Sequence, residues 1–139
     1  MLKRYLLSVV IVFVLWSVLD FVIHGAILSK AYEATASLWR PMEEMKIGLM
    51  YLSSLITAAV FVGIYALLVA NKSVKTGVIY GVLMGLFSGV PMALGSYSYM
   101  PITCHIALVW FVGSIILMTL AGLCIGAIVK NNNTSAKSV

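Results

Sequence analysis

Asp20 and His24 stand out because they are ionisable side chains that lie well inside a long apolar run of the chain. They are four residues apart, which places them on one face of a helix and one turn from each other. An acid in hydrocarbon costs about 2.5–3.5 kcal/mol on insertion scales, so it should face the protein interior and a partner. We expect this face to be functional. The alternative interpretation is that the two side chains only neutralise each other as an i,i+4 pair.

Hydroxyl and imidazole groups in other apolar runs fall at a similar depth. The first run ends near Leu28, and we call this its outer end because the basic residues discussed below place it outside the cell. At about 1.5 Å per residue, His24 lies about 6 Å and Asp20 about 12 Å from this end. By the same measure Ser53 lies about 9 Å and Thr57 about 15 Å deep, and His105 opens the last run on the same side. We therefore predict a polar pocket in the outer half, lined by these five residues. The alternatives are that Ser53 and Thr57 bond carbonyl oxygens of their own helix, and that His105 meets interfacial water.

His24 and His105 also define the one cofactor site that the sequence suggests. If the first and last apolar helices are neighbours, the two imidazoles could ligate a b-type haem or a metal ion, with Asp20 orienting His24. Cys104 precedes His105 and could replace it as a soft ligand. Two histidines are a minimal ligand set, so the cofactor stays unknown, with His24, His105 and Cys104 as the candidate metal ligands.

The elements that must position these residues are membrane helices. Of the 139 residues, 63% are apolar and only 9% are charged, whereas soluble domains carry about 25% charged residues. Four apolar runs reach the roughly 20 residues that a bilayer requires. We predict an all-α fold, an integral membrane four-helix up-down bundle formed by a single domain over residues 1–130. Its helices are expected at about 5–28, 41–70, 77–98 and 104–129, followed by a disordered cytoplasmic tail at 131–139. A cleaved signal peptide is the alternative for the first run.

The basic residues predict an orientation. Six of them lie at the N-terminus, in the 71–76 turn and in the tail, against three in the 29–46 loop, where three glutamates offset them. Because positive charge favours the cytoplasmic side, we expect a multi-pass protein of the cell (inner) membrane with both termini cytoplasmic. The net charge of +5 does not indicate nucleic-acid binding, because these residues sit in short connections that set topology.

A row of glycines predicts a close helix contact. Gly77, Gly81, Gly85 and Gly89 are four residues apart and share one helix face, and small residues at this spacing let backbones approach in lipid. The seam could be intramolecular, against Gly122 and Gly126 in the last run. The alternative is a homodimer or a larger membrane complex through the same face. Pro91, farther along this run, removes a backbone hydrogen bond and should distort the helix.

Two functions remain open at this stage. The first is a binding or accessory membrane protein with the outer pocket and no turnover, because the chain shows no nucleophile–base set and no nucleotide-binding loop. The second is a proton-coupled transporter of a small molecule or ion that uses Asp20, since burial raises a carboxyl pKa and so suits proton exchange. No catalytic residue is assigned and an enzyme is not expected. The lipid bilayer is the one partner that the composition implies.

Overall fold

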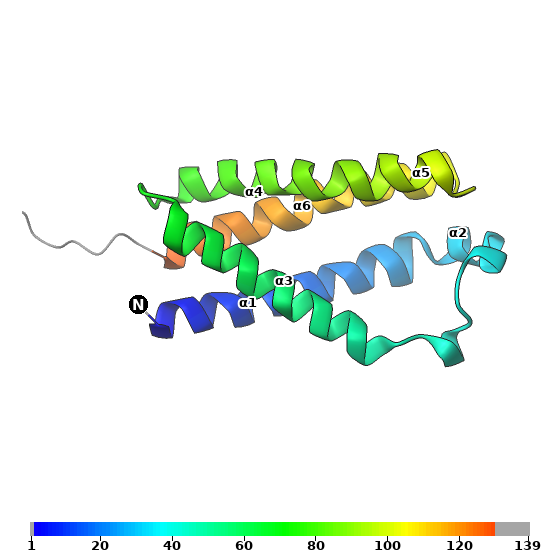
Figure 1. Ribbon diagram of the computed structural model, residues 1–139, viewed down its shortest axis with the longest axis horizontal. Coiled ribbons are helices and arrows are strands. Elements are labelled where there is room, and N and C mark those ends of the chain that lie inside the picture. The colour runs from blue at the N-terminus through cyan, green and yellow to red at the C-terminus, as the bar shows by residue number, and fades with distance from the viewer. Residues whose placement is uncertain (1, 130–139) are drawn as a thin grey trace, which may run out of the picture.

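The computed structural model describes residues 2–129, and these residues form helices with no strand among them. Four of the helical stretches are long and apolar enough to cross a membrane: Leu2–Ile27, Ile47–Leu68, Val74–Tyr99 and Cys104–Ile128. Successive stretches run in opposite directions along one long axis (Figure 1). The all-helical fold and the four apolar helices are thus confirmed. The tail predicted at 131–139 lies outside the described residues.

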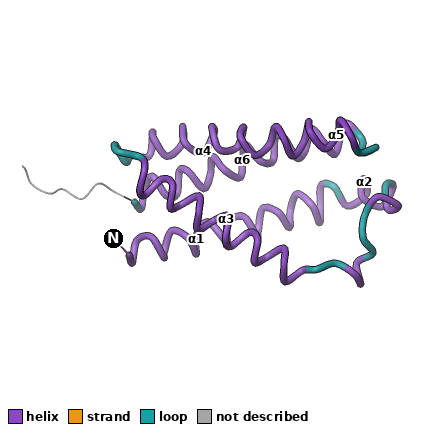
Figure 2. The backbone as a smooth tube through the Cα atoms, viewed as in Figure 1, coloured by secondary structure: helices purple, strands orange, loops and turns teal. Residues whose placement is uncertain are grey.

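Two of the four stretches change helix type part-way. Short helices connect the first stretch to the second (Figure 2). In chain order the elements are α1 (Leu2–Asp20), the π-helix η1 (Phe21–Ile27), α2 (Ser29–Ala34), the 3₁₀-helices η2 (Ala36–Leu38) and η3 (Met42–Glu44), α3 (Ile47–Leu68), α4 (Val74–Gly89), the π-helix η4 (Val90–Gly95), α5 (Ser96–Tyr99) and α6 (Cys104–Ile128). Pro91 lies at the start of η4, so the expected distortion takes the form of a π-helical segment.

The predicted start of the second membrane helix, at Pro41, is wrong. The chain forms a 3₁₀ turn at Met42–Glu44 and an extended residue at Met45, and α3 begins only at Ile47. The physical reason is charge: acidic and basic residues at 43, 44 and 46 remain in the polar connection, and the helix starts with the first uncharged run. By contrast, α6 begins at the predicted Cys104, where the Thr103 side chain accepts a hydrogen bond from the Ile106 amide at 3.3 Å.

The most extensive helix contact joins α4 to α6, and the glycine row forms it. All four glycines are buried: Gly77, Gly81, Gly85 and Gly89. A Cβ atom built at Gly81 would lie 2.7 Å from the Cα of Thr119, and one built at Gly85 would lie 2.7 Å from the Cα of Ile115. The intramolecular seam is therefore confirmed. Because α6 covers this face, association between copies stays a prediction that would have to use another surface.

The hydrophobic interior is divided into two clusters. The larger joins α1, α3 and α6 near the end where the chain starts, which we call the basic end. Its buried members are Val9, Val12, Trp16, Ala58, Phe61, Val62, Tyr65, Ala121, Ile125 and Val129. The smaller lies at the opposite end, called the loop end, where Leu28 packs with Ile102, Ile106 and Ala107. Toward the loop end α3 diverges from α4 and α6 (Figure 1).

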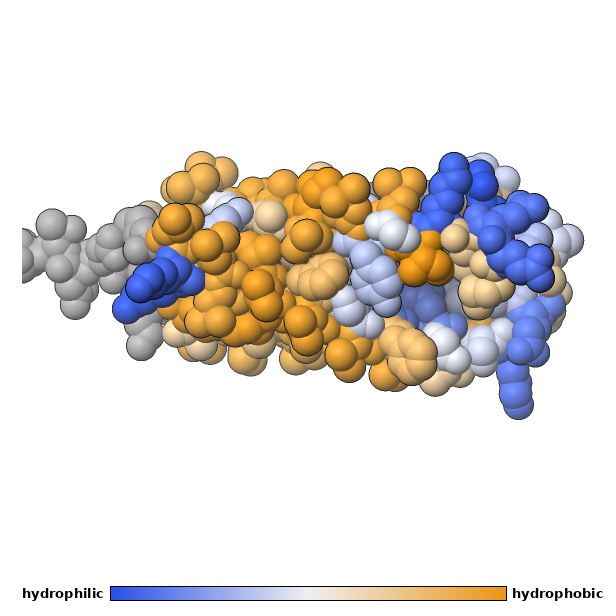
Figure 3. Space-filling model, turned by 90° about the horizontal axis from the view of Figure 1, so that it is seen from below, coloured by the Kyte–Doolittle hydropathy of each residue, from blue (hydrophilic) through white to orange (hydrophobic). Residues whose placement is uncertain are grey.

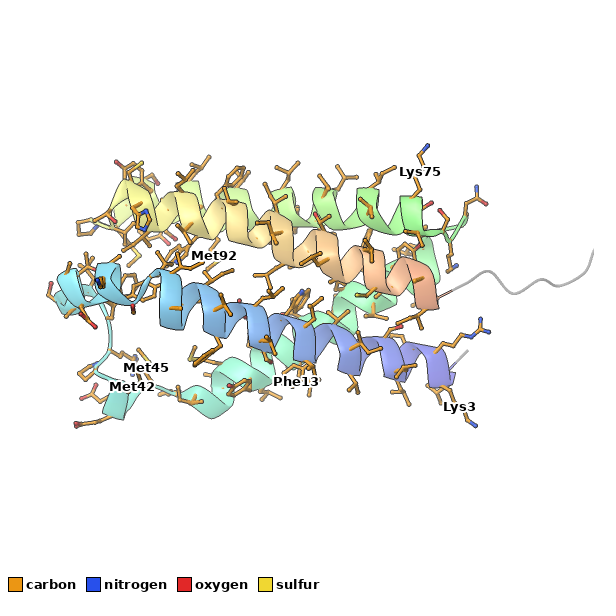
Figure 4. The ribbon with its side chains drawn as sticks, turned by 180° about the vertical axis from the view of Figure 1, so that it is seen from behind. Lys3, Phe13, Met42, Met45, Lys75 and Met92 are labelled. Atoms are coloured by element: carbon orange, nitrogen blue, oxygen red, sulfur yellow. The ribbon has the colours of Figure 1, made fainter. Side chains whose placement is uncertain are left out.

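The outer surface has an apolar belt between two polar ends (Figure 3). Exposed large hydrophobic side chains cover the sides of all four long helices. Lys3 and Lys75 both lie at the basic end, on different sides of the molecule, whereas Met42 and Met45 lie at the loop end (Figure 4). Four apolar helices whose exposed side chains form such a belt indicate a multi-pass membrane protein.

Candidate functional site

A cavity of about 360 Å³ lies between the two hydrophobic clusters. All four apolar stretches contribute to its wall, which consists of Trp16, Asp20, Ile23, His24, Met50, Ser53, Ser54, Thr57, Ser88, Met92, Val109, Trp110, Gly113, Ser114, Leu117 and Met118. White and light-blue atoms interrupt the orange belt on the side toward the loop end (Figure 3). Four of the five residues predicted for the outer pocket, Asp20, His24, Ser53 and Thr57, therefore line one cavity.

The backbone that carries Asp20 and His24 leaves ordinary α-helical geometry. Asp20 ends α1, and the next seven residues form the π-helix η1, which the hydrogen bond from the Leu28 amide to the Ile23 carbonyl closes at 2.9 Å. The second π-helix, η4, contributes Met92 to the same wall. Such segments are rare and occur frequently at functional sites. Both π-helices border this cavity, which supports its assignment as the functional site.

Asp20 is the acidic side chain of the cavity and has no hydrogen-bond partner among the described residues. It interacts electrostatically with His24, but no ion pair joins the two. The side chain is partly exposed, and its position in the wall opens it to the cavity. The carboxylate therefore has unused hydrogen-bonding capacity that faces a space large enough for a ligand.

His24 is held by a hydrogen-bonded chain that leads away from Asp20. The Trp110 Nε1–H donates to the Tyr32 hydroxyl oxygen at 2.8 Å, and that hydroxyl lies 2.6 Å from His24 Nδ1. Because an indole nitrogen only donates, the arrangement that uses every proton has the Tyr32 O–H donating to an unprotonated Nδ1. His24 is then a neutral imidazole with its proton on Nε2. The His24 and Tyr32 rings also stack, with centroids 5.8 Å apart.

Tyr32 ties the connecting segment to the membrane helices. It comes from α2, outside the membrane-spanning stretches, and contacts His24 of η1 and Trp110 of α6. Trp39 extends this contact, with ring centroids 5.2 Å from Tyr32 and 6.1 Å from Trp110, and its Nε1–H donates to the Thr35 hydroxyl at 2.9 Å. Burial raises the pKa of Tyr32, and the hydrogen bond from Trp110 opposes this shift. The segment 28–39 therefore packs against His24 and Trp110, two residues of the cavity wall.

The hydroxyl groups of the wall fall into two sets. The Thr57 hydroxyl donates to the Ser53 carbonyl at 2.8 Å and the Ser88 hydroxyl to the Met84 carbonyl at 2.9 Å, so both bond within their own helix. This confirms the alternative interpretation for Thr57. The hydroxyls of Ser53, Ser54 and Ser114 have no hydrogen-bond partner among the described residues, and all three line the cavity. They are the hydroxyls available to a ligand.

His105 and Cys104 do not lie in this wall. Both are exposed in the first turn of α6 at the loop end, and Cys104 is a free thiol. Within residues 2–129 no three histidine, cysteine, aspartate or glutamate side chains come together as a metal site would require. The structure therefore places His24 but not His105 at the cavity, and it lends no support to a site shared by the two histidines.

Several residues of the site were not expected from the sequence. The hydrogen-bonded chain from Trp110 through Tyr32 to His24 was not predicted. Ser88 and Ser114 received no role. The sequence offered a signal for Ser88 alone, which adjoins Gly89 of the glycine row. Ser114 faces the same row, because a Cβ built at Gly89 would lie 3.1 Å from the Ser114 Cβ.

Comparisons of the chain with protein-family models, with curated proteins and with solved structures find no match. The cavity is therefore the feature that indicates a function. Its wall combines an unpaired carboxylate, three available hydroxyls, a neutral imidazole and two indoles with aliphatic and thioether side chains. Such a mixture of apolar surface and a few convergent polar groups is typical of small-ligand sites.

Proposed function

We propose that the protein is a four-helix up-down bundle of the cell membrane that binds a small ligand in the outer half of the bundle without turning it over. It acts either alone or as the ligand-binding subunit of a larger membrane complex. The observation that carries this proposal is the cavity between the two hydrophobic clusters, in which side chains from four apolar helices surround the unpaired Asp20.

The absence of turnover is inferred from the hydrogen bonds of the wall. A nucleophilic mechanism needs a hydroxyl or thiol bonded to a general base. Here His24 Nδ1 is engaged with the phenol of Tyr32, and the Thr57 and Ser88 hydroxyls bond carbonyl oxygens of their own helices. Both described cysteines lie outside the wall. Binding needs none of these pairings and is therefore the simpler use of the site.

The proposed orientation places the loop end outside and the basic end in the cytoplasm. It rests on the basic asymmetry of the sequence and on the position of Lys3 and Lys75 at one end of the molecule (Figure 4). In a background with Cys104 and Cys124 replaced by serine, Ser37→Cys should react with a membrane-impermeant thiol reagent added outside the cell. Reaction only after the cytoplasmic side is opened would reverse the topology.

The binding site can be tested without a known ligand. In the same cysteine-free background, Ser53→Cys should react with a small polar thiol reagent because Ser53 lines the cavity. Leu52→Cys is the matched control, since Leu52 is 52% exposed on the neighbouring position but does not line the cavity. Its thiol should face lipid and react at least about tenfold more slowly, since the thiolate that reacts is disfavoured in apolar surroundings. Equal rates at the two positions would remove the aqueous pocket from the proposal.

A proton-coupled transporter is the second candidate, and the unpaired state of Asp20 favours it. Ionisable residues at this depth commonly mark ion or proton pathways. Proteoliposomes that contain a pH-sensitive dye would be screened with small organic cations, anions and neutral solutes. Proton-linked uptake should be lost in Asp20→Asn and retained in Ser17→Ala, whose hydroxyl bonds its own helix at Phe13. Equal uptake by Asp20→Asn and the native protein would exclude Asp20 from coupling.

A further inference from the structure

The charge of the cavity wall favours one sign of ligand. Among its sixteen residues Asp20 is the one acid, and no lysine or arginine is present. His24 interacts with the carboxylate electrostatically, but no hydrogen bond or ion pair joins the two, and its Nδ1 lies 2.6 Å from the Tyr32 hydroxyl instead. Acids at membrane depth normally pair with another group. The missing partner of Asp20 is therefore a cation, whereas an anionic ligand would meet a carboxylate without any positive group nearby.

The cavity opens sideways, toward the lipid. Near the basic end α3 and α4 are joined: the Tyr80 hydroxyl donates to the Phe61 carbonyl at 2.7 Å, and the Tyr65 and Tyr80 rings lie 5.4 Å apart. Toward the loop end α3 diverges (Figure 1), and there Met50 and Met92 line the cavity while being 59% and 45% exposed. Met92 lies between the α4–α6 layer and α1 (Figure 4). The two thioethers therefore border a lateral opening within the apolar belt.

The volume and the lining of the cavity suit an organic ligand better than a bare metal ion. A volume of about 360 Å³ falls at the small end of the range of about 300–1,000 Å³ for organic ligand sites. Nine of the sixteen wall residues are apolar, aromatic or glycine. The indole N–H groups of Trp16 and Trp110 already donate hydrogen bonds to the Leu117 carbonyl and the Tyr32 hydroxyl. The faces of the two rings remain as contact surfaces, which favour an organic cation.

From these observations we infer that the ligand is an amphiphilic organic ammonium ion. The inference rests on the proposed binding function and specifies its substrate class. The ammonium group pairs with the Asp20 carboxylate and donates to the hydroxyls of Ser53, Ser54 and Ser114. The apolar tail lies along the methionine-lined opening between α3 and η4, through which the molecule enters from the outer leaflet.

Three probes with one carbon skeleton test the charge: hexylammonium, hexanol and hexanoate. Each is titrated into the full-length protein in nanodiscs of zwitterionic lipid, with empty nanodiscs as the blank. Binding is followed by tryptophan fluorescence, since two of the three tryptophans line the cavity. Hexylammonium should bind saturably and at least about tenfold more tightly than hexanol, a difference of about 1.4 kcal/mol, and hexanoate should not exceed the blank.

Two variants test the charge of the cavity and its volume separately. Asp20→Asn should weaken hexylammonium at least tenfold and leave hexanol unchanged, because only the charge partner is removed. Ser53→Leu keeps Asp20 but fills the cavity, so it should weaken both probes. Ile56→Leu is its control, because Ile56 is 56% exposed on the same helix and does not line the cavity. Thermal unfolding of each variant reports whether it is folded.

The outcomes distinguish the two proposals. If hexanol binds as tightly as hexylammonium and Ser53→Leu removes both, the pocket stands and the ammonium inference fails. If no probe binds above the blank, the inference fails, and the cysteine reaction at position 53 then decides separately whether the pocket exists. If Asp20→Asn does not fold, the ratio of hexylammonium to hexanol affinity in the native protein decides, and a ratio near one overturns the inference.

Discussion

Replacing Gly81 by alanine adds one methyl group at the centre of the α4–α6 seam. An ideal Cβ at this position would lie 2.7 Å from the Cα of Thr119 and would also collide with the main-chain carbonyl of Met118. Both are backbone atoms, which no side-chain rotation can move aside. The two helices must therefore separate locally to admit the methyl group.

The size of the effect follows from that separation. Carbon atoms pack at about 3.5–4.0 Å, so relief of the 2.7 Å contact requires about 1 Å of movement, and a gap of this size forfeits a quarter to a half of each dispersion contact across it. Overpacking of this kind costs about 1–3 kcal/mol. The alanine regains up to about 1 kcal/mol of helix propensity. We expect a net loss of about 1–2 kcal/mol in the free energy of unfolding.

Gly48→Ala is the matched control, because a Cβ at Gly48 in α3 meets no atom within 4 Å. It gains the same helix propensity without a collision and should be neutral or slightly stabilised. Both variants would be unfolded by titration with denaturing detergent in mixed micelles and followed by circular dichroism. Gly81→Ala should unfold at a lower detergent concentration than Gly48→Ala, and its free energy of unfolding should be lower by about 2 kcal/mol. Equal stability of the two variants would refute the close seam.

Three further predictions concern the hydrogen bonds around the cavity. Tyr32→Phe leaves the Trp110 indole N–H without its acceptor and should lower the free energy of unfolding by about 1–2 kcal/mol. Burial raises the pKa of Tyr32 above its ordinary 10.0. The neutral phenol therefore stabilises the fold fully below pH 10.0 and progressively less as the pH rises through the pKa of the folded state. In detergent titrations, the free energies of unfolding of the native protein and of Tyr32→Phe should approach each other over this pH range. Trp16→Phe removes the 3.2 Å bond to the Leu117 carbonyl and should cost about 1 kcal/mol in the same assay, whereas Ser17→Ala should stay within about 0.5 kcal/mol.

The helices and the seam were predictable because local signals determine them. Length and hydropathy specify the four apolar stretches, and four glycines at one spacing can approach another backbone on one face only. The start of the last helix was correct, because the capping residue Thr103 and the apolar run agree there, and the start of the second was wrong. At Pro41 the proline favours a helix start, but the charged residues that follow keep the chain in the polar connection.

The cavity itself was predictable only in part. Depth along each helix brought Asp20, His24, Ser53 and Thr57 to one level, and the structure places them in one wall. Depth along a helix does not tell which way a residue faces around the helix axis. His105 was therefore included in the predicted pocket, although its side chain is exposed outside the cavity. The contact of Tyr32 with His24 and Trp110 depends on how the 28–46 connection folds back, which no periodicity in the sequence specifies.

The position of the cavity follows from the way the helices pack. The glycine seam brings α4 and α6 together along their length, while α3 is joined to α4 near the basic end, through Phe61, Tyr65 and Tyr80. Two helices that approach closely and a third that diverges leave a wedge of space toward the loop end, and Tyr32 of segment 28–39 contacts His24 and Trp110 in its wall. An apolar wedge would fill with lipid chains. Here the wedge contains Asp20, so lipid chains would bury a carboxylate without a partner, and a ligand that brings a positive charge is the filling that the chemistry of the wall favours.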